Sequence, residues 1–510
     1  MLGSYVFTDP KGELYDRTAG YLKEHGYEIK VLNLVRPQYS DGYNPLMHIS
    51  SELDVDVIAN TIVKGQKTDS GSDPYWDDMA EMLLKALIYY LIATRPEEEQ
   101  NLASCAELVR AANKNGGSNL LTDLMNQLPY DHPARMNYKS IEIAPEKTYG
   151  SILSSLQSKL GKFDSKEIAE LTSTDTINFE DIGNKKTAVY VISSDTHTAY
   201  DFLLTIFFSQ MIQQLYDYAD QNGGRLKEQT FFILDEFANI GKIPDFDKKI
   251  STSRSRKISF SVILQNIDQL EAVYEKSYET IMGNCDTHVF LGSNSFKTVE
   301  YFSKALGEKT IGRDSISVNK DKQNHKTGKS VSDQVMARAL MTPDELRRMD
   351  NDECIIFEKG IKPVKANKFY YFKHKIMANN LKNAEISHND IGEIQRGSWR
   401  KFNPYNPWSE DKAEKEAQNL KVESLDDLFD DDSSSQKDET AKKEEVDNTK
   451  LSQTLENSNT TNNDMISLGN LESAEKSQKA SIITDEEDSY DLQKELEAKF
   501  DELFGPIDEE

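Results

Sequence analysis

The first 35 residues alternate between short apolar runs and one amphipathic stretch. SYVFT (4–8) predicts a strand, and Asp9-Pro10 is typical of a helix start with proline at the first helical position. The following residues, KGELYDRTAGYLKEH, place apolar side chains at helical spacing, and Gly26 suits the end of that helix. EIKVLNLV (28–35) predicts the next strand. This β-α-β order indicates a parallel sheet.

The next part of the chain has a different pattern. A polar stretch rich in helix breakers, QKTDSGSDP (66–74), marks a boundary. From Tyr75 to about Leu160 the apolar residues recur mostly at helical spacing, and no strand pattern interrupts them. We therefore expect an inserted all-helical domain here.

Strand patterns then return, separated by helical ones. They are TAVYVISS (187–194), FFILDE (231–236), ISFSVILQN (258–266) and THVFLGS (287–293). Because each is short and rich in β-forming residues, we expect these four to be buried central strands of one sheet. A further stretch, 353–372, predicts a strand pair that closes the folded region.

Charge separates the end of the chain from the rest. The 510 residues carry a net charge of −27, but residues 411–510 alone hold 30 acidic and 11 basic residues, a net of −19. Apolar residues are scarce there, so we expect 410–490 to be disordered. Two islands, SLDDLFDDD (424–432) and KFDELFGPIDEE (499–510), repeat an acidic pair followed by Leu-Phe. They are either a docking element that folds on a partner or a chance similarity.

Cysteine usage and hydropathy bear on the compartment. Cys105, Cys285 and Cys354 lie far apart without metal-ligand spacing, which favours reduced thiols inside a cell. The longest apolar run, MLLKALIYYLIA (82–93), is well short of the roughly 20 residues that span a bilayer. As given, the chain is expected to be soluble and cytoplasmic.

The stretch FFILDEFANIG (231–241) carries candidate chemistry. An apolar strand runs into Asp235 and Glu236, and ligands of open α/β sheets bind at this end of the strands. One carboxylate can hold Mg²⁺ while its neighbour positions and polarises an attacking water. The alternative is a surface turn in which both acids are merely solvated.

Two further groups could complete such a site. Gln265 follows the next strand, where it could contact a γ-phosphate or the water, or make only local hydrogen bonds. Arg254 and Arg256, in STSRSRK (251–257), lie at a helix-to-strand junction. Arginine can clamp a phosphate bidentately, including across a subunit boundary, but such a pair is also common on a solvated face.

Seven motifs in this order make the chain resemble the type IV secretion coupling proteins, the TraG/TraD-like ATPases of bacterial conjugation. The resemblance covers about residues 3–375. The motifs are YVFTDPKGELY (5–15), GYEIKVLNLV (26–35), YNPL (43–46), DPYWDDMAEMLLKALIYYL (73–91), FFILDEFANIGKIPDF (231–246), ISFSVILQNIDQL (258–270) and LMTPDELRRM (340–349).

The resemblance implies an α/β fold: a RecA-like, P-loop-type nucleotide-binding domain with a mainly parallel sheet, interrupted by an all-α domain. We therefore expect five segments along the chain. They are the first part of the nucleotide-binding domain (1–70), the helical domain (71–165), the second part of the nucleotide-binding domain (166–375), a linker (376–409) and an acidic, largely disordered tail (410–510).

The resemblance also implies a function. Members form hexamers at the cytoplasmic face of the bacterial membrane, hydrolyse ATP with Mg²⁺, and pass relaxase-bound single-stranded DNA to the type IV secretion channel. By motif, Asp235 corresponds to the magnesium ligand, Glu236 to the catalytic acid and Gln265 to the nucleotide-sensing glutamine. Arg254 corresponds to the arginine finger that reaches a neighbouring subunit, and Arg256 lies closer to the following strand.

One expected element departs from the family pattern. Members carry G-x-x-x-x-G-K-[ST] before the segment that matches residues 3–15, and membrane-spanning helices before that. The Gly-Lys-Ser of this chain, Gly328-Lys329-Ser330, has Gln323 in place of the first glycine and no strand leading in, so we do not interpret it as a phosphate loop. We expect the chain as given to lack the phosphate loop and the membrane anchor, to bind Mg-ATP weakly or not at all, and to be inactive.

Three functions stay open at this point. The first is a coupling protein that recruits the relaxosome and drives its transfer by ATP hydrolysis. The second is a non-catalytic adaptor that binds relaxosome or channel partners through the helical domain and acidic tail. The third, a soluble RecA-like ring ATPase such as a helicase, is disfavoured by TDPKGEL together with the helical insert. No basic stripe with interleaved aromatic residues is identified as a DNA path.

Overall fold

The computed structural model describes residues 3–64, 74–112, 119–193, 200–320 and 327–405. The predicted disorder of 410–490 and the two acidic Leu-Phe islands lie outside these residues.

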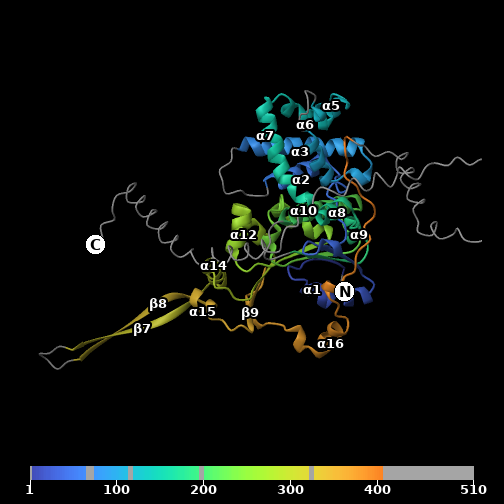
Figure 1. Ribbon diagram of the computed structural model, residues 1–510. Coiled ribbons are helices and arrows are strands. Elements are labelled where there is room, and N and C mark those ends of the chain that lie inside the picture. Colours follow the sequence, from blue (N-terminus) through green and yellow to red (C-terminus); the bar gives the residue numbers. More distant parts are fainter. Residues whose placement is uncertain (1–2, 65–73, 113–118, 194–199, 321–326, 406–510) are drawn as a thin grey trace, which may run out of the picture. The chain divides into compact units, whose positions relative to one another are not determined.

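Five strands form one all-parallel sheet, in the order β2-β3-β1-β4-β5. Figure 1 shows this sheet between the helices labelled α10 and α1. The strands are β1 (Ser4–Thr8), β2 (Glu28–Asn33), β3 (Thr187–Ile192), β4 (Thr230–Leu234) and β5 (Ile258–Val262). In the central strand β1, Tyr5 stands opposite Ala188 of β3 and Phe231 of β4. The predicted α/β class with a mainly parallel sheet is confirmed.

Both faces of this sheet are covered, because successive side chains of a strand point to opposite faces. On one face Phe7 stacks on Tyr190 with ring centroids 4.9 Å apart, beneath helix α1 (Glu13–Glu24). On the other face Val6 and Phe232 belong to the same core as helix α10 (Asp201–Gln221). Burial on two faces is the arrangement that near-continuous apolar strands predict.

A layer of helices lies between β2 and β3 in sequence, and none of the described residues from 75 to 160 is in a strand, as predicted. The helices are α2 (Glu52–Lys64), α3 (Pro74–Thr94), α4 (Leu102–Ala111), α5 (Leu120–Asn126), α6 (Pro133–Glu142), α7 (Glu146–Leu160), α8 (Lys166–Ser173) and α9 (Phe179–Asn184). They share one hydrophobic core with α10 and one face of the sheet. The domain boundaries at 70/71 and 165/166 stay predictions. Among the described helices, none has both the length and the apolar character to cross a bilayer.

The prediction of four buried central strands in one sheet is wrong for two of them. β5 is an edge strand and is only partly buried. β6 (Thr287–Phe290) leaves the parallel sheet and pairs antiparallel with β9 (Glu353–Glu358), which in turn pairs with β10 (Val364–Asn367). The physical reason is that β6 buries only one side: Phe290 is 2% exposed, whereas its neighbour Val289 is 50% exposed. The strand pair predicted in 353–372 is confirmed.

The remaining elements follow β4. The helices are α11 (Phe246–Thr252), α12 (Ile267–Tyr274), α13 (Tyr278–Asn284), α14 (Phe296–Leu306), α15 (Pro343–Arg347) and α16 (Lys375–Asn383), and the strands are β7 (Glu308–Lys320) and β8 (Thr327–Ala339). β7 and β8 form an antiparallel hairpin, in which Gly328 is paired with Asn319 and Ser330 with Ser317. Gly328-Lys329-Ser330 is therefore extended backbone within a strand, which agrees with the prediction that it is not a phosphate loop.

The start of α1 differs from its prediction. The helix begins at Glu13, three residues after Pro10, because Gly12 takes a left-handed conformation (φ 74°) as the N-cap. The carboxylate of Asp9 accepts the Tyr15 N–H at 2.8 Å and so caps the first turn from a distance. A Cβ at Gly12 would lie 2.5 Å from His388 Nδ1, so both the conformation and the space require glycine.

Residues 384–405, called the C-terminal strap below, run along the folded part of the chain. The strap follows α16 and contacts α1, where the Ile386 N–H donates to the Asp16 carbonyl oxygen at 3.0 Å. It ends on the helical layer: Arg400 Nε donates to Glu99 Oε1 at 2.9 Å, and Phe402 is 3% exposed. The segment 376–409, expected to be a linker, thus contains most of a helix and a packed strap.

Candidate functional site

The acidic pair lies where β4 ends, at the carboxyl edge of the parallel sheet. Thr8, the last residue of β1, donates its hydroxyl to the Asp235 carbonyl oxygen at 2.7 Å. On the other side, the Phe237 N–H donates to the Ile263 carbonyl oxygen at 3.1 Å, just beyond β5. The backbone of the acidic pair is therefore fixed from both neighbouring strands.

Glu236 holds a strained conformation. Its φ of 51° and ψ of 45° are left-handed, which costs a non-glycine residue about 1–2 kcal/mol. The Gln265 side-chain amide donates to Glu236 Oε1 at 2.7 Å. Strained non-glycine residues persist where the surrounding structure imposes them, and they cluster at functional sites. Asp235, Glu236 and Gln265, proposed from the sequence as one site, are brought together.

The environment of Asp235 suits a cation. Partial burial raises the pKa of its carboxyl group, and the neighbouring Glu236 carboxylate raises that pKa further. The Glu236 N–H, which lies 3.1 Å from Asp235 Oδ1, opposes this by lowering the pKa. A cation would relieve both burial cost and repulsion. Among the described residues no three His, Cys, Asp or Glu side chains cluster as a metal site, but Mg²⁺ commonly uses only one or two carboxylates with water and phosphate oxygens.

The two arginines lie elsewhere. They belong to a 3₁₀ turn (Ser253–Arg256) that enters β5 at its amino end, the opposite edge of the sheet from Glu236. Arg256 donates two hydrogen bonds to Asp220, at 2.9 and 2.8 Å, and its guanidinium lies 4.8 Å from the ring centre of Tyr216. The Arg254 side chain makes no hydrogen bond or ion pair with any residue in the described part of the chain. Within one chain, the structure does not bring Arg254 to the acidic pair.

A second hollow at the same sheet edge was missed from the sequence. It measures about 280 Å³, and its lining includes Lys11, Asn33, Arg36 and His388. Lys11 is exposed in the turn before α1. The sequence could have indicated this hollow by position alone, because Asn33 is the last residue of β2 and Lys11 lies in the TDPKGEL motif directly after β1. His388 could not be anticipated, because it reaches this edge from the strap.

The YNPL motif has a structural role. The Tyr43 hydroxyl donates to Gln210 Oε1 of α10 at 2.6 Å, and Tyr43 is 1% exposed. Asn44 Nδ2 donates to the Gln100 carbonyl oxygen at 2.8 Å, in the helical layer. These bonds join the loop after β2 to helix α10 and to the layer of helices inserted between β2 and β3.

Comparison with known proteins agrees with this architecture. The family model for type IV secretory system conjugative DNA transfer matches residues 1–393. A conjugal transfer protein TraG of Escherichia coli is 25% identical over 412 residues, covering 74% of this chain and 64% of its own length. VirD4 of Rhizobium radiobacter is 25% identical over 396 residues, covering 74% of this chain and 54% of its own length. The chain thus spans less than two thirds of these curated relatives.

Solved structures of the plasmid coupling protein TrwB share the fold. The complex with the non-hydrolysable ATP analogue ADPNP has a TM-score of 0.52 at 14% identity, covering 72% of this chain and 78% of that chain. The complex with ADP and Mg²⁺ has a TM-score of 0.51 at 14% identity, covering 78% and 80%. The match of the family model over more than three quarters of the sequence decides the family. This chain belongs to the type IV secretory system conjugative DNA transfer family, the coupling proteins.

Proposed function

We propose that this chain is the motor part of a coupling protein, which recruits a relaxosome and drives its single-stranded DNA into a type IV secretion channel by ATP hydrolysis. The observation that carries the proposal is the triad of Asp235, Glu236 and Gln265 at the carboxyl edge of a parallel sheet. The complexes of TrwB with an ATP analogue, and with ADP and Mg²⁺, support a nucleotide as the ligand of this fold.

In this proposal each side chain has one task. Asp235 holds Mg²⁺, directly or through water; the ion, when bound, neutralises phosphate charge. Gln265 donates to Oε1 of Glu236 and so fixes the carboxylate, leaving Oε2 to orient the attacking water and accept its proton. Gln265 also senses the γ-phosphate, because a hydrogen bond from its side-chain amide to a phosphate oxygen would compete with the bond to Glu236.

The position of Arg254 supports an assembly. β5 is five residues long, so at roughly 3.3 Å per residue the acids and Arg254 are separated by more than about 13 Å along the strand. Arg254 of one copy therefore serves the site of a neighbouring copy, as an arginine finger does in trans. A homohexamer at the cytoplasmic face of the membrane is the arrangement we propose for the full-length protein.

A DNA-transfer assay tests the proposal. Donor cells lacking the gene are complemented with the natural gene or with a Glu236→Gln variant, which keeps the side-chain shape but removes the general base. We expect transfer to fall at least about 10²-fold. Glu279→Gln, an exposed residue of α13, is the matched control and should transfer normally.

The opposite outcome would favour the adaptor. If the Glu236→Gln variant is present at normal level and transfers DNA as well as the control, hydrolysis at this site is not needed, and binding of relaxosome or channel partners becomes the better description. Phosphate release by the purified chain adds a direct measurement. Magnesium-dependent turnover that Glu236→Gln abolishes would support hydrolysis at this site.

A further inference from the structure

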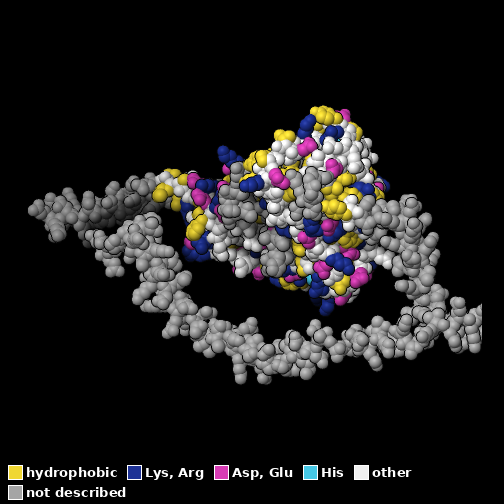
Figure 2. Space-filling model, turned by 45° about the horizontal axis from the view of Figure 1, so that its top comes forward, with side chains coloured by type: hydrophobic (Ala, Val, Ile, Leu, Met, Phe, Trp, Pro, Cys, Tyr) yellow, Lys and Arg dark blue, Asp and Glu magenta, His cyan; other side chains and the backbone are white. Residues whose placement is uncertain are grey.

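One segment has a charge unlike the rest of the chain. Residues 359–384, called the lysine segment below, contain seven lysines and no aspartate or glutamate, in a protein of net charge −27. The lysines are Lys359, Lys362, Lys365, Lys368, Lys373, Lys375 and Lys382. Figure 2 shows one face of the molecule, on which basic and acidic side chains are interspersed. The lysine segment covers β10 and α16 and leads into the C-terminal strap.

The same segment exposes large apolar side chains. Phe369 is 71% exposed, Phe372 59% and Ile376 70%. Four aromatic residues, Phe369 to Phe372, stand directly between the lysines. Leaving such rings in water is unfavourable, and their clustering with charge on one surface marks a binding site.

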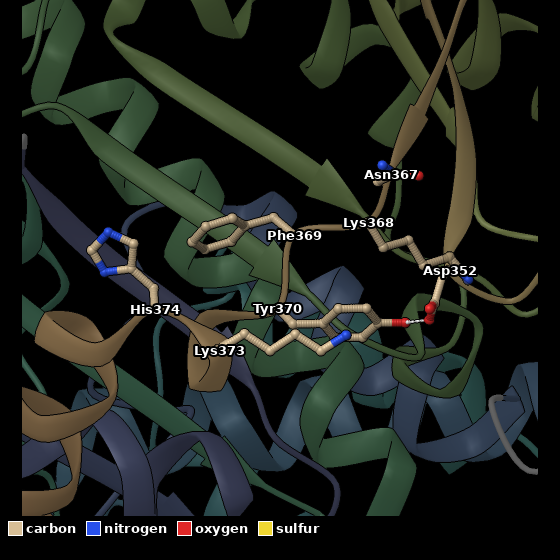
Figure 3. Close-up of a pocket in the computed structure, with 7 residues that line it drawn as sticks. All are labelled: Asp352, Asn367, Lys368, Phe369, Tyr370, Lys373 and His374. Atoms are coloured by element: carbon tan, nitrogen blue, oxygen red, sulfur yellow. Dashed lines mark hydrogen bonds between the residues drawn. The ribbon is translucent and has the colours of Figure 1, made fainter.

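Two of these rings, Phe369 and Tyr370, border a hollow of about 460 Å³, a size typical of ligand pockets (Figure 3). Phe369 and His374 lie at one side of it, with ring centroids 6.4 Å apart. The Lys373 ammonium lies 4.1 Å from the ring centre of Tyr370, whose hydroxyl donates to Asp352 Oδ1 at 2.8 Å. Tyr370 is thus held in place while Phe369 stays accessible.

Much of the positive charge is uncompensated. Lys365 pairs with Glu353 at 2.7 Å, whereas the nearest approach of Lys359 to Asp286 is 4.0 Å. Lys362, Lys375 and Lys382 are exposed and form no ion pair with any described residue. The surface therefore offers several ammonium groups to an anionic partner.

The positive surface continues onto α1. The Arg17 guanidinium lies 5.8 Å from the ring centre of Tyr371 and donates to its hydroxyl. Arg17 also approaches Glu13 at 3.8 Å, but both side chains are about half exposed, so this pair is weak. Arg17 of α1 thus adds one more cation beside an aromatic ring of the lysine segment.

We propose that the lysine segment binds single-stranded nucleic acid. Its lysines neutralise phosphates, and Phe369 and Phe372 stack on unpaired bases, which is how sequence-tolerant single-strand sites are built. A duplex hides the faces of its bases, so it would use the lysines but not the rings. This run of lysines and aromatic residues was not identified from the sequence, where its residues fall mostly in the predicted strand pair and the predicted linker.

This site is separate from the acidic triad, and its test requires no nucleotide. Binding of a fluorescent 20-nucleotide oligothymidylate to the whole chain is measured by anisotropy at several salt concentrations, beside a duplex of equal length. We expect preference for the single strand. Phe369→Ala with Phe372→Ala should weaken its binding about tenfold or more with little effect on the duplex.

Charge is tested by a matched pair of triple variants. Lys362, Lys375 and Lys382 changed to Gln should weaken binding of both nucleic acids and lower its salt dependence. Lys147, Lys166 and Lys276 changed to Gln, three exposed lysines outside the lysine segment and α1, should leave binding unchanged. Photocrosslinking of an oligonucleotide carrying 5-iododeoxyuridine should label residues 369–374.

Two outcomes would overturn the proposal. One is equal binding by the natural chain and both sets of segment variants, with crosslinks elsewhere. The other is binding to vesicles that contain phosphatidylserine but not to the oligonucleotide, which would assign the surface to a membrane. Neither result bears on hydrolysis at Glu236, so this proposal and the motor function can fail separately.

Discussion

The two ends of strands β4 and β5 differ in how their functional side chains are held. At the carboxyl end, Glu236 is strained, hydrogen-bonded to Gln265 and adjacent to a partly buried Asp235. At the amino end, Arg256 is bonded to Asp220, while Arg254 is exposed and without a side-chain partner among the described residues. The carboxyl end is therefore a pre-organised site, whereas the amino end exposes the Arg254 side chain to solvent.

This difference shows what one copy of the chain can supply. Pre-organisation at the carboxyl end needs no second molecule, because every bond that fixes Glu236 is internal. An exposed arginine at the opposite edge has a catalytic use only against another molecule. The two ends can therefore be tested by separate substitutions.

The amino end is tested by changing each arginine to alanine. Arg254→Ala should reduce DNA transfer about 10³-fold, as loss of an arginine finger does, with no change in thermal stability. Arg256→Ala should instead lower the stability of the fold by about 1 kcal/mol, since it removes an ion pair and a cation–π contact. Transfer frequency and thermal unfolding of the same variants give both readouts.

A mixed assembly sharpens this test. If Arg254 acts in trans, co-expression of Arg254→Ala with Glu236→Gln should restore part of the transfer, because some interfaces then combine an intact arginine with an intact acid. Loss of transfer by Arg256→Ala but not by Arg254→Ala would reverse the assignment of the two arginines.

The carboxyl end is tested by relieving the backbone strain at Glu236. Glu236→Gly should stabilise the fold by about 1 kcal/mol, because glycine adopts φ 51° without the steric cost, and it should also abolish transfer. Lys257→Gly is the matched control, since Lys257 has φ 60° but lies at the other edge. It should gain similar stability and keep its transfer. Loss of stability in Glu236→Gly would mean that the Gln265 bond outweighs the strain.

The smallest expected effect concerns Asp235. Because its pKa is raised above the ordinary 3.8, the folded state favours the protonated carboxyl, and this residue's contribution to stability falls as pH rises through the raised value. Asp235→Asn should therefore raise the melting temperature at pH 7.5, and the gain should shrink as pH is lowered toward 4.5. Asp131→Asn, at an exposed position, should show no such trend. A gain independent of pH would point to a cause other than ionisation.

The sequence was sufficient where local patterns decide the structure. β1 has the predicted bounds, and Gly26 takes φ 80° at the end of α1, because strand alternation and helix stops are local properties. The acidic pair was located because an apolar run followed by carboxylates places them at a strand end whatever the sheet order. Gln265 was identified by the resemblance of its motif to that of the coupling proteins.

Other features depend on contacts that are distant in sequence. The pairing of β6 with β9 joins residues about 70 positions apart, and no property of THVFLGS alone selects that partner. The left-handed conformation of Glu236 could not be predicted from the sequence either, because glutamate rarely adopts a positive φ. α1 starts later than predicted because Gly12 adopts a left-handed conformation as its N-cap. The contact of Gly12 with His388, a residue far away in the sequence, also requires glycine at this position.

The C-terminal strap sets a practical limit on how this protein can be shortened. A version that stopped at residue 375, the predicted end of the nucleotide-binding domain, would leave Glu99, now 1% exposed, without its Arg400 partner. It would also uncover the site now filled by Phe402. Arg95 would remain to pair with Glu99, so the loss would be partial. For crystallisation or partner screening, the shortest chain that keeps these contacts ends near residue 405.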